Sequence, residues 1–202
     1  MTITERSVIL ATCEKDMDKV AAVKQAVYDI TINEGYQNLS MSKIAKKAGV
    51  SQATIYLTYA SKEEMLTSMY VEARDILDSQ TKVDTSPDVD VEAELKRMFT
   101  HYVETLLSHP DQAFFMDAVN NTPELIEQNV YQKMLHNNDD ILALIKLGKD
   151  SGKIADIPFP MIVSFTFNAL NSWMKANYGH HVDPDDAQIR TAVNLCWKVI
   201  KA

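Results

Sequence analysis

Residues 40–64 read SMSKIAKKAGVSQATIYLTYASKEE, and their spacing predicts two short helices joined by a tight turn. Ser40 precedes a run that stops at Gly49, and Ser51 precedes a second run that extends to Thr58. Serine is a favoured N-cap, and glycine is favoured just beyond a helix C-terminus, so the turn is marked on both sides. A helix, a tight turn and a capped second helix together form a helix-turn-helix.

The residue types around this turn separate into an inner and an outer set. Ile44, Val50 and Ile55 are the apolar positions that we expect to anchor both short helices on a preceding helix. Small side chains are needed where two short helices cross closely, and Ala45 and Ala48 meet that need. The remaining positions of the second helix should face outward, and none is acidic: Gln52, Ala53, Thr54, Tyr56 and Thr58.

This outer set suits a probe of the DNA major groove. Glutamine can pair with adenine through two hydrogen bonds, threonine can contact a thymine methyl group, and alanine permits close approach. A second group of side chains is placed for phosphate contacts: Ser40, Ser42, Tyr56, Tyr59 and Lys62. The alternative interpretation is an ordinary surface helix of an all-α bundle.

The charge of the chain is unevenly distributed. Of its 202 residues, 24% are charged and the formal net charge is −8. Residues 1–60 carry seven Lys and Arg against six Asp and Glu, whereas residues 61–202 carry thirteen against twenty-two. The stretch from Gly35 to Lys62 holds four lysines and no acid. An acidic protein with one acid-free, lysine-bearing segment is expected to contact a polyanion there alone.

Helical periodicity dominates the rest of the chain, which predicts an all-α fold. Val20, Val23, Val27 and Ile30 form one apolar stripe on a helix that stops at Gly35. Ser61 opens a helix with a capping box that extends to about Leu77. The later helices are expected over these segments: 91–109, 111–120, 123–149, 161–178 and from Pro184 to about Ile200. Five Gly and six Pro give little of the punctuation that a many-stranded fold needs.

The chain lacks the sequence signals of disulfide-linked proteins, membrane proteins and common enzyme families. Cys13 and Cys196 have no metal-binding spacing, which favours a reducing, cytoplasmic compartment. No apolar run is long enough for a membrane span. The chain shows no Gly-rich phosphate loop, no GxSxG and no HExxH, so we expect no enzyme and no cofactor. The loop from His180 to Asp186 has possible metal ligands without a metal-site spacing, and we expect no metal there.

Residues from about Met17 to Tyr70 resemble the DNA-binding domain of the TetR family of bacterial transcriptional regulators. The family order is kept without a gap through Ala26, Gly35-Tyr36, Ser40-Met41, Ile44-Ala45, Ala48-Gly49-Val50-Ser51, Thr54-Ile55-Tyr56 and Ser61-Lys62-Glu63-Glu64. The chain departs from the pattern at Gln52 and Ala53, where the family often has Lys and Gly, and at Leu57-Thr58-Tyr59, where it often has His-Tyr-Phe. The operator sequence therefore cannot be carried over.

The resemblance implies a helix-turn-helix domain at residues 17–77 and a larger helical ligand-binding and dimerisation domain at 78–202. It also implies a homodimer that binds a near-palindromic double-stranded operator and is released by a small effector.

The 161–178 segment has two apolar stripes, and one of them needs a partner. With the last helix, it is similar to the family's dimer interface. The residues expected there are Val163, Phe167, Leu170, Met174, Ile189, Val193, Cys196 and Ile200. A fully internal helix of a monomer is the alternative.

Bulky side chains in the acidic part predict a pocket for a small apolar or aromatic effector. The expected lining is Met98, His101, Tyr102, Phe114, Phe115, Tyr131, Met134, Phe165 and Trp173, although any one of them can equally be plain core. His101 with Glu104 can orient a polar group of the effector. The sequence thus predicts a ligand-responsive transcriptional regulator, most simply a repressor. The alternatives are an activator without an effector and a helical protein-interaction module.

Overall fold

The computed structural model describes residues 3–78, 83–135 and 139–202, and their side chains over 17–77, 83–133 and 139–202. Within these ranges the regular structure is helical, and the β pairing consists of one isolated bridge between Ile154 and Lys201. The all-α prediction is confirmed. The helices of the described part include none that combines the length and the apolar character needed to cross a bilayer.

The chain folds into two compact units. The N-terminal unit comprises Met1–Ala73 and Phe114–Val130, and the C-terminal unit comprises Arg74–Ala113 and Tyr131–Ala202. The boundary expected between residues 77 and 78 lies near the end of the helix in which the chain passes from one unit to the other. The return of residues 114–130 to the N-terminal unit has no counterpart in the sequence prediction.

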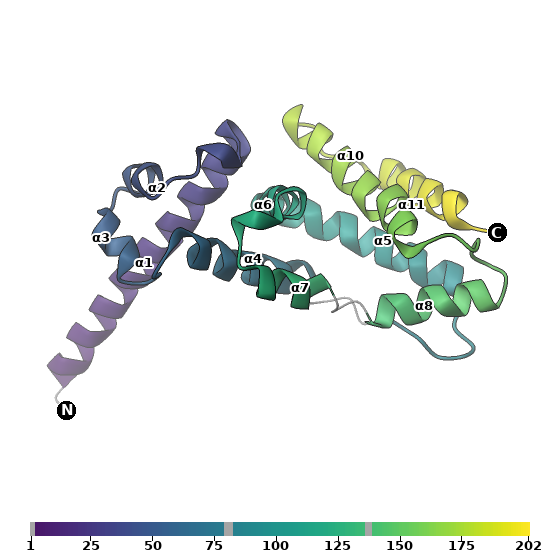
Figure 1. Ribbon diagram of the computed structural model, residues 1–202, viewed down its shortest axis with the longest axis horizontal. Helices are drawn as coiled ribbons and strands as arrows, with labels where there is room; N and C mark the ends of the chain where they lie inside the picture. Colours follow the sequence, from purple (N-terminus) through teal and green to yellow (C-terminus); the bar gives the residue numbers. More distant parts are fainter. Residues whose placement is uncertain (1–2, 79–82, 136–138) are drawn as a thin grey trace. The chain divides into compact units, whose positions relative to one another are not determined.

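In the N-terminal unit, α1 forms the support on which the next short helices pack (Figure 1). The elements are α1 (Ile3–Glu34), η1 (Tyr36–Asn38), α2 (Met41–Ala48), α3 (Gln52–Tyr56) and the first part of α4 (Lys62–Asp78). Helix α1 ends before Gly35, whose φ of 85° is readily adopted by glycine alone. The four stripe residues predicted for this helix face inward to different degrees: Val23, Val27 and Ile30 are buried, and Val20 is half-buried.

The second segment of this unit contains most of α6 (Pro110–Asn121), η2 (Pro123–Leu125) and the start of α7 (Gln128–Leu135). Phe115 meets Tyr28 of α1 edge to face, with ring centroids 5.7 Å apart. The Tyr70 hydroxyl donates to Asn120 Oδ1 at 3.1 Å, and the backbone N–H of Glu127 donates to Thr67 Oγ1 at 2.9 Å. These contacts join segments about 50 to 90 residues apart, which local periodicity cannot reveal.

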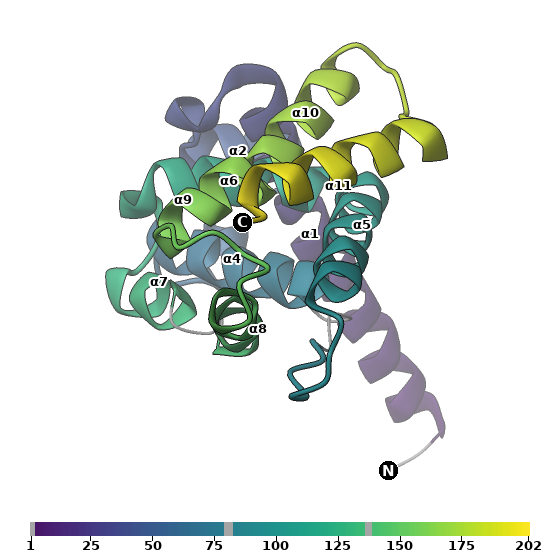
Figure 2. The same cartoon turned by 90° about the vertical axis from the view of Figure 1, so that its right-hand side faces the viewer.

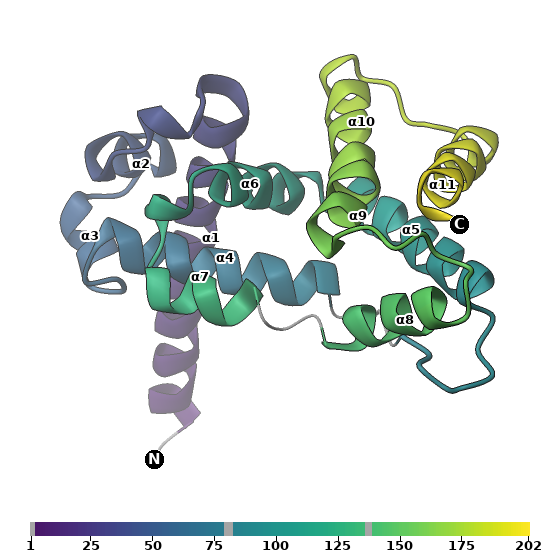
Figure 3. The same cartoon turned by 45° about the vertical axis from the view of Figure 1, so that its right-hand side comes forward.

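The C-terminal unit is built around α5 (Val91–Ser108), against which α8 (Asp139–Asp150), α10 (Phe167–Gly179) and α11 (Asp186–Ile200) pack (Figures 2 and 3). Helix α9 (Phe159–Phe165) precedes α10 and contacts α11. The core is mainly aliphatic and aromatic. Its fully buried members from α5 include Leu95, Phe99 and Val103.

Two of the expected helices are interrupted. The segment predicted as one helix over 123–149 is divided into η2, α7 and α8, with residues 136–138 outside the described ranges. The helix predicted over 161–178 is broken at Thr166, which has φ −121° and ψ −84° and is fully buried. The Thr166 hydroxyl donates to the Ile162 carbonyl at 2.6 Å, the back-bonding by which threonine bends helices. This break changes which apolar side chains face inward.

The turn after α8 depends on close backbone approach at Gly148. A Cβ placed there would lie 2.4 Å from Ile154 Cδ1 and 3.0 Å from Val91 Cγ1, and both side chains are buried. The Gly148 carbonyl accepts hydrogen bonds from the N–H groups of Lys153 and Ile154. Ile154 is thereby held in place to form its bridge with Lys201.

We predict that Gly148→Ala lowers the free energy of unfolding by about 1–3 kcal/mol, because the added methyl overpacks the core of the C-terminal unit. Gly179→Ala is the matched control, since a Cβ at Gly179 would meet nothing within 4 Å. The control should stay within about 0.5 kcal/mol of the wild type. Urea unfolding followed by circular dichroism measures both variants, and equal stabilities would contradict the close approach.

Candidate nucleic-acid interface

The helix-turn-helix is assembled by two serine caps and one glycine. Ser40 Oγ accepts from the N–H of Lys43 at 3.3 Å, and Ser51 Oγ accepts from the N–H of Thr54 at 3.1 Å. Gly49 lies between them with φ 69° and ψ 26°, the left-handed conformation that ends α2. The predicted turn and both predicted caps are therefore present, and α3 ends at Tyr56, two residues before the expected end.

Helix α3 is only five residues long, so its position depends on tertiary contacts. Ile55 supplies them from its buried face, and Ile44 does the same for α2, with exposed fractions of 2% and 0%. Ala45 is also buried, whereas Val50 in the turn is half-buried. The inward set predicted from the sequence thus fixes which side of α3 faces out.

The outward face of α3 is mainly polar. Gln52, Ala53 and Tyr56 are exposed, and Thr58 is exposed just beyond the helix. Thr54 differs from the others, because it is half-buried and its hydroxyl lies 2.9 Å from the Ser51 hydroxyl. We therefore regard Thr54 as a residue that holds the start of α3 rather than as one that projects from it.

Two residues predicted to contact phosphates are placed differently by the structure. Tyr59 is 7% exposed, and burial raises the pKa of its phenol, an effect that the nearby charge of Lys24 opposes. Lys62 Nζ donates to the carbonyl of Leu39 at 3.2 Å, which joins α4 to the start of α2. Neither side chain projects freely from the surface. Sequence spacing missed this because it locates a residue along a helix without showing what covers it.

The remaining polar groups frame the exposed face. Ser40 and Ser42 are exposed at the start of α2, as predicted. Lys43 forms an ion pair with Glu34, and Lys47 lies 3.5 Å from Asp29, so both are directed toward α1. Lys46 is exposed, and no ion pair is formed by it within the described ranges. Among the four lysines of the acid-free stretch expected to contact a polyanion, it is the one best placed to do so, although the sequence prediction did not name it individually.

The residues predicted to line an effector pocket are divided between the units. Phe114 and Phe115 belong to the N-terminal unit, where Phe115 is fully buried against Tyr28. Met98 is core of the C-terminal unit, and His101, Tyr102 and Tyr131 are half-buried there. The side chain of Met134 lies outside the described residues. His101 Nε2 lies 3.5 Å from Thr105 Oγ1, whereas Glu104 is exposed.

The two apolar stripes of α9 and α10 have opposite surroundings. The stripe predicted to face a partner lies inward: Leu170 is 2% exposed and Met174 is 7% exposed. Phe167 packs edge to face against Phe99 and Tyr102, with centroids 5.2 Å apart in both pairs, and Val163 is half-buried. The α11 residues expected in the interface are likewise buried in the core of this unit: Ile189, Val193, Cys196 and Ile200.

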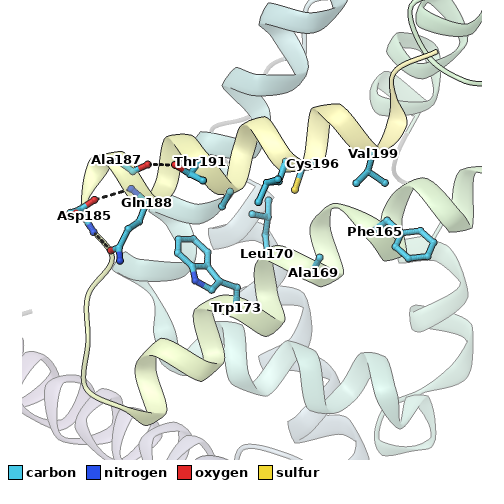
Figure 4. Close-up of a pocket in the computed structure, with 12 residues that line it drawn as sticks. Phe165, Ala169, Leu170, Trp173, Asp185, Ala187, Gln188, Thr191, Cys196 and Val199 are labelled. Atoms are coloured by element: carbon cyan, nitrogen blue, oxygen red, sulfur yellow. Dashed lines mark hydrogen bonds between the residues drawn. The ribbon is translucent and has the colours of Figure 1, made fainter.

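The other stripe faces out. Phe165, predicted as pocket lining, is 55% exposed, and Leu195 and Val199 of α11 are 55% and 51% exposed. With Ala169 and Trp173 of α10 they line an open apolar groove of about 520 Å³ between α10 and α11 (Figure 4). Leu195 and Val199 lie one turn apart on the outer side of α11, and the sequence analysis assigned no role to them. Thr191, Leu195 and Val199 follow one another at intervals of four residues, which places them on one face of a helix. This spacing is the sequence signal that could have identified Leu195 and Val199.

Cys196, which also lines this groove, contacts the break in the α9–α10 segment (Figure 4). Its Sγ lies 3.9 Å from the carbonyl oxygen of Thr166, and burial raises the pKa of the thiol to about 11. A buried thiol of this kind is protonated and unreactive at neutral pH. At the far end of the groove, Asp185 caps α11 and forms a capping box with Gln188. Asp185 is therefore committed to the helix start.

The geometry defines a helix-turn-helix protein with a second, helical unit. Residues 30–69 match the family described as "Bacterial regulatory proteins, tetR family". A curated relative, the fatty acid metabolism regulator protein of Bacillus subtilis (strain 168), is 39% identical over 54 residues. That match covers 27% of this chain and only 28% of the relative's length.

Solved structures of transcription and fatty acid degradation regulators share the fold. A TetR family transcription regulator from Marinobacter aquaeolei VT8 aligns with a TM-score of 0.74 at 23% identity, over 93% of this chain and 98% of that chain. The fatty acid degradation regulator FadR from Bacillus halodurans aligns with a TM-score of 0.59 at 22% identity, over 90% and 93%. Residues 30–69 of this chain therefore match the TetR family, and the chain has the fold of these solved structures. The predicted resemblance is confirmed, and the matched proteins are transcription regulators rather than enzymes.

The contrast between Tyr56 and Tyr59 leads to a matched pair of variants. We predict that Tyr56→Phe weakens binding to a duplex of random sequence by about two- to tenfold, because one exposed hydroxyl loses its phosphate hydrogen bond. Tyr59→Phe removes the same atom from a buried site and should leave the affinity unchanged. Fluorescence anisotropy at low salt measures both. A loss confined to Tyr59→Phe would contradict the orientation of α3 described above.

Proposed function

We propose that this protein is a transcriptional repressor that binds a near-palindromic operator as a homodimer and is released by a small effector. The observation that carries the proposal is the exposed, acid-free face of α3 with Gln52, Ala53 and Tyr56, on a domain matched to the TetR family. Gln52 can read adenine, and the small Ala53 lets the helix approach the base edges closely. Ser40, Ser42 and Lys46 flank this face and can contact phosphates.

The exposed stripe of α9–α11 supports the dimer. Three large apolar side chains that line the groove are more than half exposed: Phe165, Leu195 and Val199. An exposed apolar groove of this kind marks an interaction surface in a chain that otherwise carries a net negative charge. A twofold axis through the groove would bring two such faces together, as an isologous contact requires. We therefore transfer the dimer interface from the buried stripe to the exposed one.

Dimerisation fits the reading of DNA for a geometric reason. Two recognition helices on one dimer meet the same side of the duplex when they lie roughly 34–36 Å apart, one helical turn of B-DNA. An effector that changes this separation weakens the fit to one half-site. A coupling of about 1–3 kcal/mol between effector and DNA is sufficient for a useful switch.

The effector is proposed to be apolar. Half-buried aromatic side chains of the C-terminal unit, Tyr102 and Phe167, offer an apolar contact, and His101 offers a polar one. The curated relative and the Bacillus halodurans protein are named for fatty acid metabolism and degradation. We propose a molecule with an aliphatic chain as the class of effector for the present protein as well.

Selection of duplexes from a fragmented genome of the source organism tests the regulator function. We expect the purified protein to enrich one inverted repeat, with an affinity that falls steeply as salt rises because phosphate contacts release counterions. The position of the repeat relative to promoters separates a repressor from an activator. Failure to enrich any sequence at low salt would instead favour the protein-interaction alternative.

The dimer leads to a second prediction with a matched control. Leu195→Glu places a charge in the apolar face of each copy, and we expect the dimer dissociation constant to rise by at least about tenfold. Leu142→Glu makes the same change at a leucine that is 41% exposed on α8, outside the groove, and should leave the dimer intact. Sedimentation velocity compares the two variants. If both remained dimeric, this face would not be the interface.

A further inference from the structure

We propose that Leu57, together with Ala53, recognises the 5-methyl group of a thymine in each operator half-site. The proposal deepens the DNA-binding function above and rests on it. Leu57 is 87% exposed, more than any other large apolar side chain in the described part of the chain. Burial of this side chain against a ligand would be favourable, whereas its exposure to water in the free protein has no benefit for folding.

The backbone places Leu57 on the outward side of α3. Its φ of −70° and ψ of −25° continue the helical conformation for one residue beyond Tyr56. Its N–H donates to the carbonyl of Ala53 at 3.1 Å, which is the hydrogen bond of a helical turn. Residues four apart on a helix lie on the same face, so the Ala53 and Leu57 side chains are neighbours. Ile55, between them in sequence, is buried on the opposite face.

Ala53 and Leu57 thus form a short apolar strip on a face that is otherwise polar. Gln52 and Tyr56 lie beside the strip, and both are exposed. No acidic residue occurs between Gly35 and Lys62, so the segment that carries the strip holds no carboxylate that would oppose approach to DNA. An aliphatic strip at the surface of a recognition helix has to find an apolar partner in the groove.

The major groove offers one such partner. Adenine, guanine and cytosine present hydrogen-bond donors and acceptors there, whereas thymine adds a methyl group at C5. A leucine placed over polar base edges would displace water from them without replacing its hydrogen bonds. Placed over a thymine methyl group, it buries apolar surface on both sides. The strip therefore discriminates in favour of thymine, and Gln52 can read an adjacent adenine independently.

The test removes the methyl group from the DNA and the side chain from the protein. A duplex enriched by the wild-type protein from a random-sequence pool is prepared with each thymine replaced in turn by deoxyuridine, which lacks only the 5-methyl group. We expect one replacement per half-site to weaken wild-type binding by about fourfold. Leu57→Ala should weaken binding to the normal duplex at least as much and be insensitive to that same replacement. Double-mutant analysis detects this loss of additivity.

Leu142→Ala is the matched protein control, because Leu142 is an exposed leucine outside the helix-turn-helix. It should bind both duplexes as the wild type does. Leu57 is too exposed to contribute to the core, so Leu57→Ala should keep the wild-type melting temperature. Unchanged DNA affinity of Leu57→Ala, or equal sensitivity of both proteins to every deoxyuridine, would overturn the thymine contact while the regulator function stands. If the wild type enriches no duplex at all, the regulator function itself is overturned, and the exposed leucine points to a protein partner.

Discussion

The burial of Ile55 against the N-terminal core is the contact on which the proposed DNA-reading face depends. A five-residue helix has no stability of its own, because nucleation of a helix is unfavourable and propagation is too short to compensate. The Ser51 cap and the Ile55 contact together hold α3 in one orientation. The α3 side chains assigned to DNA, Gln52, Ala53, Tyr56 and the adjoining Leu57, project outward because Ile55 projects inward. A change at Ile55 would therefore alter the whole proposed interface at once.

In the C-terminal unit, too, the burial of one helix face determines which side chains are left at the surface. Its α9–α10 segment has two apolar stripes, and the break at Thr166 decides how each is used. The inner stripe, with Leu170 and Met174, completes the core around α5, and the outer stripe joins Leu195 and Val199 in the apolar groove. A dimer through this groove would leave the protomer core intact. Folding and dimerisation can thus be separated by mutation.

Residue types and spacing were sufficient for the helix-turn-helix. The caps at Ser40 and Ser51 and the glycine turn appear as predicted, because each is set by interactions within a few residues. The predicted inward positions Ile44 and Ile55 are also buried, and their burial depends on the helices that cover them. The predicted phosphate contacts of Tyr59 and Lys62 could not be judged from local spacing. Their neighbours come from other helices, so a position that looked suitable for phosphate contact proved to be buried in one case and bonded to the Leu39 carbonyl in the other.

The sequence by itself determined the all-α class and the turn at Gly49, since capping, periodicity and short-range spacing are local properties. Its motifs also carried the resemblance to the TetR family. Tertiary structure alone decided that residues 114–130 join the N-terminal unit and which stripe of α10 is buried. The physical reason is that two stripes of similar hydrophobicity are equivalent until a core is available to cover one of them. Only packing against α5 removes that equivalence, and the stripe left uncovered becomes the surface available to a partner.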